Sequence, residues 1–293
     1  MIGIIGAGAW GSALFYALKE KNECLITSRK RRDIKEFVSL EEVLKSEYIV
    51  ISIAAQAIRE FLKKVDLKDK KILVASKGID NKELKFINEL FEEYVSKDNL
   101  AFLSGPSFAK EVREKKPTAL VVASKNINLA EKFASFFPSY LKMYTSLDVE
   151  GVEVAGAYKN VIAIASGVCE GLNLGNNAKA ALLARGLVEM DRFGEKFGAK
   201  KDTFLGVAGS GDLFLTANST MSRNYRVGLN LAKGKLLEDI LTELGEVAEG
   251  VYTTKAIYEI AKRKNIYTPI ANEVYRIIYE GKNPQESLKD LLN

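Results

Sequence analysis

Lys159 lies in a stretch of small and apolar residues that runs from Gly156 to Asn160. At helical spacing it shares a face with Ala155 and Ile162. Burying an ammonium group without a partner is costly, so this lysine should be paired, deprotonated, or placed in a cleft. The alternative is a snorkelling lysine, whose stem covers the apolar face while its amine stays in water.

A second group of polar residues lies further along the chain. Ser222, Arg223 and Asn224 offer a hydroxyl, a guanidinium and an amide, and a guanidinium binds phosphate in a planar, bidentate fashion. The alternative is a helix cap, with Ser222 at the N-cap and Arg223 in solvent. Asp212 could pair with Lys159 and orient it, or could be a turn aspartate that binds its own backbone.

The composition narrows the chemistry that these residues can perform. The 293-residue chain has no histidine, which excludes histidine-dependent dehydrogenase sites, the usual serine and cysteine triads, and nearly every zinc site. Proton transfer must therefore fall to Lys, Asp, Glu, Tyr or Cys, and no metal is expected. The net charge of +5 suits an anionic small molecule as well as a polyanion, and no nucleic-acid-binding motif is present.

The same composition bears on location. Two cysteines far apart, Cys24 and Cys169, indicate a reduced protein. No apolar run reaches the ~20 residues of a membrane span. Strand-like sequence begins at Met1 without a charged leader, so we expect a cytoplasmic protein with no signal peptide.

The N-terminal sequence predicts a dinucleotide site. A strand pattern at Ile2–Ile5 leads into Gly-x-Gly-x-x-Gly, and a helical pattern follows. Gly6 permits a tight turn, Gly8 lets the backbone approach the pyrophosphate, and Gly11 allows close packing of helix on strand. The alternative is a glycine-rich turn without a ligand.

The end of the second strand bears on the choice of cofactor. An NAD-selective site usually carries Asp or Glu about 20 residues beyond the glycines, to bind the ribose 2′-hydroxyl. After the strand at Glu23–Thr27 this chain has Ser28 and four consecutive cations, of which Arg29 is best placed to meet a 2′-phosphate. NADP(H) is therefore favoured and NAD(H) possible, although a solvated basic loop would give the same sequence.

Alternating strand and helix patterns predict an N-terminal Rossmann-like α/β domain over residues 1–146, with a parallel, doubly wound sheet. Ligands gather at the C-terminal ends of such strands, where the polar segments 75–78 and 104–109 fall. Further strands are expected at Tyr48–Ile53, Lys71–Ser76, Leu100–Leu103, Ala119–Ala123 and Leu141–Thr145, with helices near Glu41–Ser46, Ala57–Val65 and Lys82–Tyr94.

Residues 147–293 show long helical patterns and little strand signal, which predicts an all-α C-terminal domain that binds substrate. Two segments, 206–226 and 245–250, are expected to be non-helical. The helices are expected at Val149–Cys169, Asn177–Phe197, Val227–Ala232, Leu236–Leu244, Val251–Lys264 and Ile270–Tyr279.

Six short motifs occur in order over nearly the whole chain: Gly-x-Gly-x-Trp-Gly, Ser-Lys-Gly, Ser-Gly-Pro-Ser, Gly-Ala-x-Lys-Asn, Gly-Asp-Leu and Ser-Arg-Asn. The ordered set resembles the bacterial branch of the NAD(P)-dependent glycerol-3-phosphate dehydrogenase family. This resemblance implies reversible reduction of dihydroxyacetone phosphate to sn-glycerol 3-phosphate for phospholipid synthesis, by a homodimer.

The resemblance also implies roles for individual residues, with Lys159 as the proton donor and acceptor and Lys77 and Asp212 assisting it. Ala9, where many relatives carry Ser, and a short segment between Arg32 and Glu41 are departures from the family pattern. The implied substrate contacts are Lys77, Gly105, Ser107, Lys159, Asp212, Ser222, Arg223 and Asn224. The implied cofactor contacts, besides the three glycines, are Ala9, Trp10, Arg29, Lys77, Ala109, Arg223, Val247 and Glu249.

Two other functions are alternatives to this one. A lysine-dependent reductase of β-hydroxyacids or of 6-phosphogluconate would need a carboxylate clamp, and the ordered motifs argue against it. A nucleotide-sensing protein that keeps the fold without catalysis typically loses the polar residues of the substrate domain. Lys159, Asp212 and Arg223 are all present here.

Overall fold

The structure is a computed structural model that describes residues 1–245 and 247–292. Its contacts divide the chain into two compact units, and each is described here by itself. The first unit comprises Met1–Lys77 and Ile87–Glu153, and the second comprises Gly78–Phe86 and Val154–Asn293. This division differs from the predicted boundary at residue 146 in two ways. The segment Gly78–Phe86 packs with the helical unit, and the helix at Val149–Gly171 begins in the first unit.

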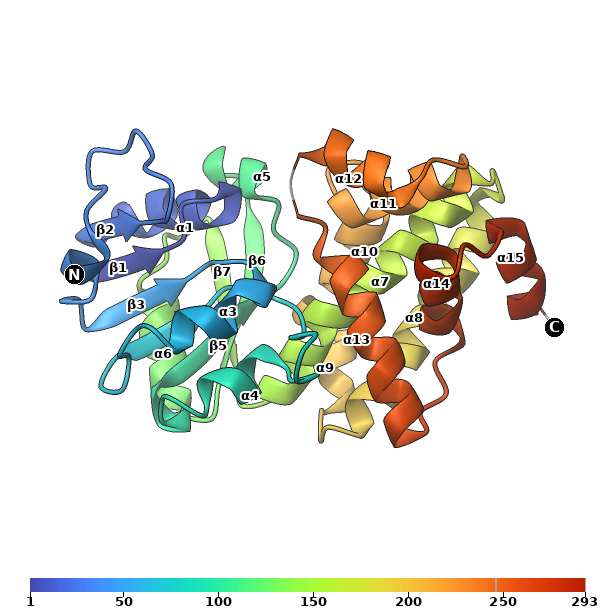
Figure 1. The fold of residues 1–293 in the computed structure, drawn as a ribbon. Coiled ribbons are helices and arrows are strands. Elements are labelled where there is room, and N and C mark those ends of the chain that lie inside the picture. The colour runs from blue at the N-terminus through green and yellow to red at the C-terminus, as the bar shows by residue number, and fades with distance from the viewer. Residues whose placement is uncertain (246, 293) are drawn as a thin grey trace. The chain divides into compact units, whose positions relative to one another are not determined.

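The first unit contains a seven-stranded sheet in the order β2-β1-β3-β4-β5-β6-β7 (Figure 1). Neighbouring strands are parallel, with Ile5 opposite Ile51 for example, except that β5 and β6 are antiparallel. The strands are β1 Ile2–Ile5, β2 Cys24–Thr27, β3 Tyr48–Ile51, β4 Lys71–Val74, β5 Leu100–Ser104, β6 Thr118–Ser124 and β7 Leu141–Ser146.

The predicted all-parallel sheet is therefore wrong at one pair of strands. The connection between β5 and β6 carries only the five-residue helix α5, Ala109–Arg113. At roughly 1.5 Å per residue this helix is too short to return the chain along the seven residues of β6. The chain instead enters β6 from the end at which it leaves β5.

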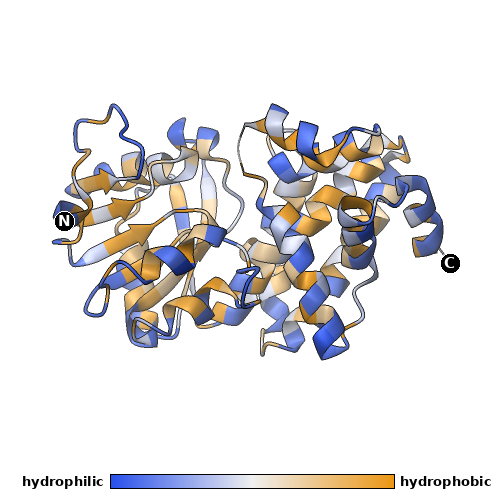
Figure 2. Ribbon diagram, in the orientation of Figure 1, coloured by the Kyte–Doolittle hydropathy of each residue, from blue (hydrophilic) through white to orange (hydrophobic). Residues whose placement is uncertain are grey.

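Both faces of the sheet are covered by helices, and most of its strands are coloured as hydrophobic in Figure 2. Val50 of β3 packs in a core with helix α1, while its neighbours Ile49 and Ile51 point to the other face and are also fully buried. The helices of this unit are α1 Ala9–Lys19, α2 Leu40–Val43, α3 Ala55–Leu62, α4 Ile87–Phe91, α5 and α6 Ile127–Ser135, with a 3₁₀ turn at Lys97–Asn99.

The helix predicted at Lys82–Tyr94 is confirmed only over α4. Before α4, Ile79 and Phe86 form an isolated antiparallel bridge, and the Asp80 carboxylate accepts hydrogen bonds from the backbone of Lys82 and Glu83. These bonds form a turn at the start of the segment, and the bridge between Ile79 and Phe86 keeps the residues between them out of a helix.

The described residues of the second unit form helices without a strand, as predicted. Helix α7, Val149–Gly171, begins in the first unit and is the most apolar of them. It is long and apolar enough to cross a membrane by length and composition, which the sequence analysis did not expect, but 94% of its most apolar window is buried inside the protein. The other helices are α8 Gly175–Glu195, α9 Lys201–Leu205, α10 Asp212–Ala217, α11 Arg223–Ala232, α12 Leu237–Leu244, α13 Glu249–Lys264, α14 Pro269–Tyr279 and α15 Pro284–Leu292.

The prediction that residues 206–226 are non-helical is wrong. A π-helical turn at Val207–Gly211 leads directly into α10, and α11 starts at Arg223. A Cβ atom on Gly209 would lie 2.3 Å from the carbonyl oxygen of Phe204. Close packing therefore requires glycine within this turn, although glycine has a low intrinsic helix propensity. In the second predicted interruption, Gly245 ends α12 in the left-handed conformation, and Glu246 lies outside the described residues.

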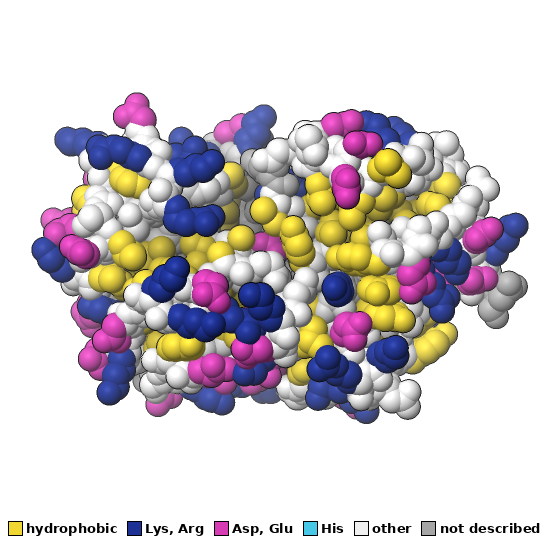
Figure 3. Space-filling view, in the orientation of Figure 1, with side chains coloured by type: hydrophobic (Ala, Val, Ile, Leu, Met, Phe, Trp, Pro, Cys, Tyr) yellow, Lys and Arg dark blue, Asp and Glu magenta, His cyan; other side chains and the backbone are white. Residues whose placement is uncertain are grey.

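The surface carries mixed charge. On the face in Figure 3, lysine and arginine side chains are interspersed with aspartate and glutamate rather than gathered into one basic stripe. This face offers no continuous surface of the kind that binds a nucleic-acid backbone.

Candidate active site

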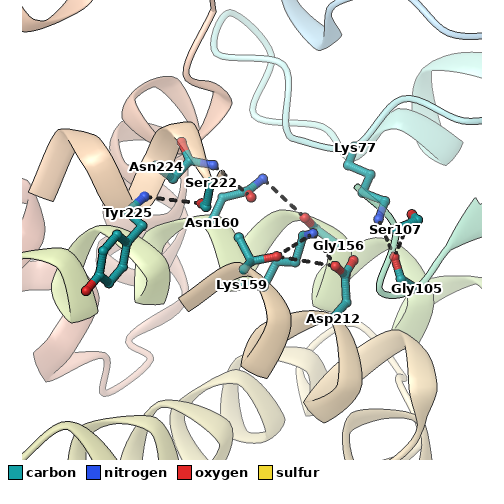
Figure 4. A network of polar contacts seen from close by, with 11 residues as sticks. Lys77, Gly105, Ser107, Gly156, Lys159, Asn160, Asp212, Ser222, Asn224 and Tyr225 are labelled. Carbon is teal, nitrogen blue, oxygen red and sulfur yellow. Dashed lines mark hydrogen bonds and ion pairs between the residues drawn. The ribbon is translucent and has the colours of Figure 1, made fainter. Parts of the chain in front are cut away.

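In the second unit, Lys159 and Asp212 form a buried ion pair (Figure 4). The Lys159 Nζ atom lies 2.5 Å from Asp212 Oδ1 and 3.1 Å from Thr216 Oγ1. The Thr216 hydroxyl also lies within hydrogen-bonding distance of Asp212 Oδ1, at 3.3 Å. Lys159 is 8% exposed and Asp212 is 1% exposed, so the alternative of a snorkelling lysine is wrong.

Local sequence explains how α10 presents these partners. Asp212 is the first residue of α10 and follows the π-helical turn directly. Thr216 follows four residues later and therefore lies on the same face. The π-helical turn before α10 sets the direction in which the Asp212 side chain leaves the backbone, towards Lys159 on α7.

A second polar network surrounds the start of α11. The Ser222 hydroxyl accepts the backbone N–H of Tyr225 at 3.2 Å, so Ser222 is the helix cap that the sequence left as an alternative. Asn224 donates from Nδ2 to Asn160 Oδ1 at 2.9 Å and accepts the backbone N–H of Gly250 through Oδ1 at 3.0 Å. These bonds fix the amide of a residue at the N-terminus of a ten-residue helix, a position that favours anions.

Arg223 is the first residue of α11, and its side chain is exposed. The capping role of Ser222 and an anion-binding role of Arg223 are compatible, because the cap uses the serine hydroxyl and not the guanidinium group. Asn224, the next residue, is buried.

In the first unit, three predicted contacts meet at the ends of β4 and β5. Lys77 donates to the carbonyl oxygen of Gly105 at 3.4 Å, and the Ser107 hydroxyl donates to the same oxygen at 3.0 Å (Figure 4). Gly105 has φ +125°, and a Cβ atom there would lie 3.0 Å from the carbonyl oxygen of Ala119. A side chain at this position would therefore be strained as well as crowded.

The glycine-rich segment has the geometry of a cradle for a nucleotide. Gly6 has φ +114°, and a Cβ atom on Gly11 would lie 1.8 Å from the carbonyl oxygen of Gly6. A Cβ atom on Gly8, by contrast, would have no atom within 4 Å. Gly8 is the N-cap of α1, whose first turn has no acidic residue, so this open position fits the close approach of a pyrophosphate.

Other predicted cofactor contacts lie around this cradle or in the second unit. Ala9 and Trp10 begin α1, Arg29 is exposed just after β2, and Ala109 begins α5. In the second unit, Val247 is 44% exposed and Glu249 is the first residue of α13. Within the described residues no three Cys, Asp or Glu side chains gather as a metal site would require.

The family of the chain follows from comparison with known proteins. The family model for the NAD-dependent glycerol-3-phosphate dehydrogenase N-terminus matches residues 31–130, and the model for the C-terminus of the same enzyme matches residues 148–289. The chain belongs to this family.

Individual relatives are similar to this chain over nearly its full length. A protein of Campylobacter lari named glycerol-3-phosphate dehydrogenase [NAD(P)+] is 63% identical over 100% of this chain and 97% of its own. A protein of the same name from Nitratiruptor sp. is 61% identical over 99% and 97%. The crystal structure of glycerol-3-phosphate dehydrogenase from Coxiella burnetii has a TM-score of 0.93 at 31% identity, covering 100% of this chain and 98% of that one. The resemblance and the two-part fold inferred from sequence are confirmed.

Two residues to which the sequence analysis gave no role lie in the site. Asn160 was quoted only as part of a motif, yet it accepts the Asn224 amide. Thr216 contacts both members of the buried ion pair. Its position four residues after Asp212 would have identified it, had the segment been predicted as helical.

A third missed residue, Glu189 of α8, holds the helix that carries Lys159. Glu189 is 1% exposed, and its carboxyl group accepts hydrogen bonds of 2.8 Å from the hydroxyl of Tyr158 and from the backbone N–H groups of Ile270 and Ala271. Burial raises the pKa of Glu189, although these three donors oppose the shift. The residue next to Lys159 is thereby tied to the N-terminus of α14.

Proposed function

We propose that this chain catalyses reversible hydride transfer between NAD(P)H and dihydroxyacetone phosphate, forming sn-glycerol 3-phosphate, with Lys159 as the general acid and base. The observation that carries the proposal is the buried Lys159–Asp212 pair in a chain of this family, whose curated relatives bear the name of that enzyme. A reductase needs one proton for each hydride, and without histidine the buried lysine is the best candidate to supply it.

The chemistry follows from the charge that develops on the substrate. Bound NAD(P)H would supply the hydride. As the hydride arrives, the carbonyl oxygen of the substrate gains negative charge. An ammonium group beside that oxygen stabilises the charge and then donates its proton. Asp212 and Thr216 hold the Lys159 Nζ atom in one place, so the proton is presented in a fixed direction. In the oxidative direction, the same amine accepts the proton of the alcohol.

The substrate phosphate is assigned to the start of α11. Arg223 can bind it with a planar pair of N–H groups, and the helix N-terminus adds its own favourable potential. Lys77 and Ser107, which meet at the Gly105 carbonyl oxygen, are assigned to the substrate side of the first unit. Both arrangements support recognition of a small phosphorylated ketone.

The cofactor is assigned to the glycine cradle and the residues around it. Gly6 and Gly11 shape the turn, and Gly8 admits the pyrophosphate at the N-terminus of α1. The exposed Arg29 after β2 supports binding of a 2′-phosphate, so NADP(H) is favoured and NAD(H) is accepted. A homodimer and supply of glycerol 3-phosphate to phospholipid synthesis, which the family resemblance implies, and a cytoplasmic location, which the composition favours, complete the proposal.

A substrate panel tests the proposal. NADPH or NADH oxidation is followed at 340 nm with dihydroxyacetone phosphate, with a β-ketoacid, and in the reverse direction with 6-phosphogluconate. We expect turnover with the triose phosphate alone. Turnover with either acid, and none with the triose phosphate, would assign the chain to another reaction of the same fold.

A further inference from the structure

Two residues of helix α7 form hydrogen bonds to the short helix α10. Lys159 is one of them, and its ammonium group contacts Asp212 and Thr216. Ser166 is the other, and its hydroxyl donates to the backbone carbonyl oxygen of Ala217 at 2.7 Å. Ala217 directly follows Thr216 and is the last residue of α10. The Ser166 bond therefore holds the residue next to one that contacts the ammonium group of Lys159.

The spacing of the two residues on α7 places both bonds on one side of that helix. Ser166 follows Lys159 by seven residues, which is about 10.5 Å along the helix axis and within about 20° of two full turns. A short helix that is held at one point can pivot about that point. Because α10 is held from two points on α7, its direction along α7 is fixed as well as its distance.

The Ser166 hydroxyl supplies a bond that α10 cannot form by itself. The last carbonyl groups of a helix have no partner within the helix, and α10 has only six residues. Ala217 and Ser166 are both fully buried, so a partner for this carbonyl group has to come from the protein. The side chain one helical turn before Ser166 on the same face is apolar Ile162, and such a side chain at position 166 could not provide the bond.

We propose that Ser166 is a positioning residue for Lys159, because its bond to Ala217 holds Thr216 and Asp212 in a fixed direction from the ammonium group. The inference rests on the proposed function, in which Lys159 delivers a proton to the substrate oxygen. Without the Ser166 bond, α10 can pivot about the ion pair, and the Lys159 Nζ atom moves with its two partners. A displacement of about 1 Å at a catalytic group can lower a rate on the order of 10²-fold, so even a partial shift should be measurable.

Ser166→Ala tests the proposal, because it removes the hydroxyl group and leaves the rest of the side chain. We expect kcat for reduction of dihydroxyacetone phosphate to fall about tenfold, while KM for this substrate and Kd for NADPH change less than twofold. The solvent deuterium isotope effect on kcat should increase, because proton transfer becomes slower relative to the other steps. Ser166→Thr keeps the hydroxyl group and should retain at least about a third of the wild-type kcat.

Ser124→Ala is the matched control. Ser124 lies in the first unit, is fully buried, and donates to the backbone carbonyl oxygen of Leu100 at 2.7 Å, the same distance as in the Ser166 bond. This variant should lower Tm about as much as Ser166→Ala does, and should leave kcat and its solvent isotope effect unchanged. If Ser166 had only a structural role, the two variants would show the same kinetics.

A double-mutant cycle tests whether the effect passes through Lys159. In a Lys159→Ala background there is no ammonium group to position, so adding Ser166→Ala should change the residual kcat less than twofold. Thermal unfolding and NADPH binding show whether each variant is folded. If Ser166→Ala does not fold, Ser166→Cys, which has nearly the same size and a weaker donor, takes its place in every comparison.

The inference is overturned if kcat of the folded Ser166→Ala variant falls less than threefold, or no more than that of Ser124→Ala. It is also overturned if kcat of Ser166→Thr falls as far as that of Ser166→Ala, or if the loss is equally large without Lys159. A wild type that does not reduce the triose phosphate would overturn the proposed function and this inference together. An active wild type with the wrong pattern among the variants would overturn the inference alone.

Discussion

Replacing Lys159 by methionine tests the energetics of the buried ion pair. Methionine is close to lysine in volume, so the change removes the ammonium group 2.5 Å from Asp212 without opening a large cavity. Asp212 is 1% exposed, and its carboxylate would lose this compensating charge in a place where water cannot replace it.

The magnitude follows from this burial. Removing one member of a buried pair typically destabilises a protein by about 3–5 kcal/mol. We expect about 3 kcal/mol here, since the Thr216 hydroxyl still lies 3.3 Å from the carboxylate. For a unit of this size that corresponds to a fall in Tm of roughly 6–12 °C.

The assay is thermal and urea unfolding followed by circular dichroism at pH 7. A second variant, Lys159→Met with Asp212→Asn, removes both charges and should recover at least about 1 kcal/mol of the loss. Lys235→Met is the matched control, because its partner Glu243 and Lys235 itself are both exposed, and it should change stability by less than about 1 kcal/mol. The reasoning is refuted if Lys159→Met is as stable as the control, or if the double variant is no more stable than the single one.

Three further predictions concern the glycines, the cofactor and Glu153, a buried glutamate of α7 whose pKa is raised by burial to about 8. Gly11→Ala should abolish NADPH binding, measured by fluorescence titration, because the new Cβ atom would lie 1.8 Å from the Gly6 carbonyl oxygen. Gly8→Ala has open space around its new Cβ atom, so it should keep the wild-type Tm, yet it should bind NADPH at least tenfold more weakly than the wild type. Equal binding by the Gly8 variant would argue against the cradle. Arg29→Asp should lower kcat/KM for NADPH at least tenfold relative to that for NADH, and an unchanged ratio would leave Arg29 as a solvated surface residue. The stability of the wild type should fall relative to that of Glu153→Gln as pH rises from 4.5 to about 8, because the unfolded chain releases a proton in this window that the folded chain retains. The difference between their unfolding free energies in urea should grow by up to about 5 kcal/mol. Parallel curves of stability against pH for the two proteins would contradict the raised pKa of Glu153.

The sequence alone was sufficient to predict those features that a local pattern determines. The glycine cradle could be predicted because tight turns and close packing leave few alternatives to glycine at Gly6 and Gly11. The pairing of Lys159 with Asp212 could be predicted because an ammonium group on an apolar helix face needs a partner.

Tertiary packing determined what the sequence could not show. Gly209 suggested a loop, yet its contact with the backbone of Phe204 holds it in a π-helical turn, so the helical position of Thr216 was missed. The antiparallel β6 follows a connection whose only helix, α5, has five residues, and the sequence pattern did not reveal how short this helix is. Glu153 resembles a surface glutamate in the sequence, and only its apolar neighbours on α7 indicate that it is buried.

The most direct test of the central claim is the rate of NADPH oxidation by dihydroxyacetone phosphate at pH 7, for the wild type and for Lys159→Ala. Lys235→Ala, which removes an exposed lysine paired with Glu243, serves as the control. If Lys159 donates the proton, kcat of Lys159→Ala should fall by about 10²–10⁴-fold while its Kd for NADPH changes less than threefold. The account is contradicted if the folded Lys159→Ala variant binds NADPH and retains more than about a tenth of the wild-type kcat.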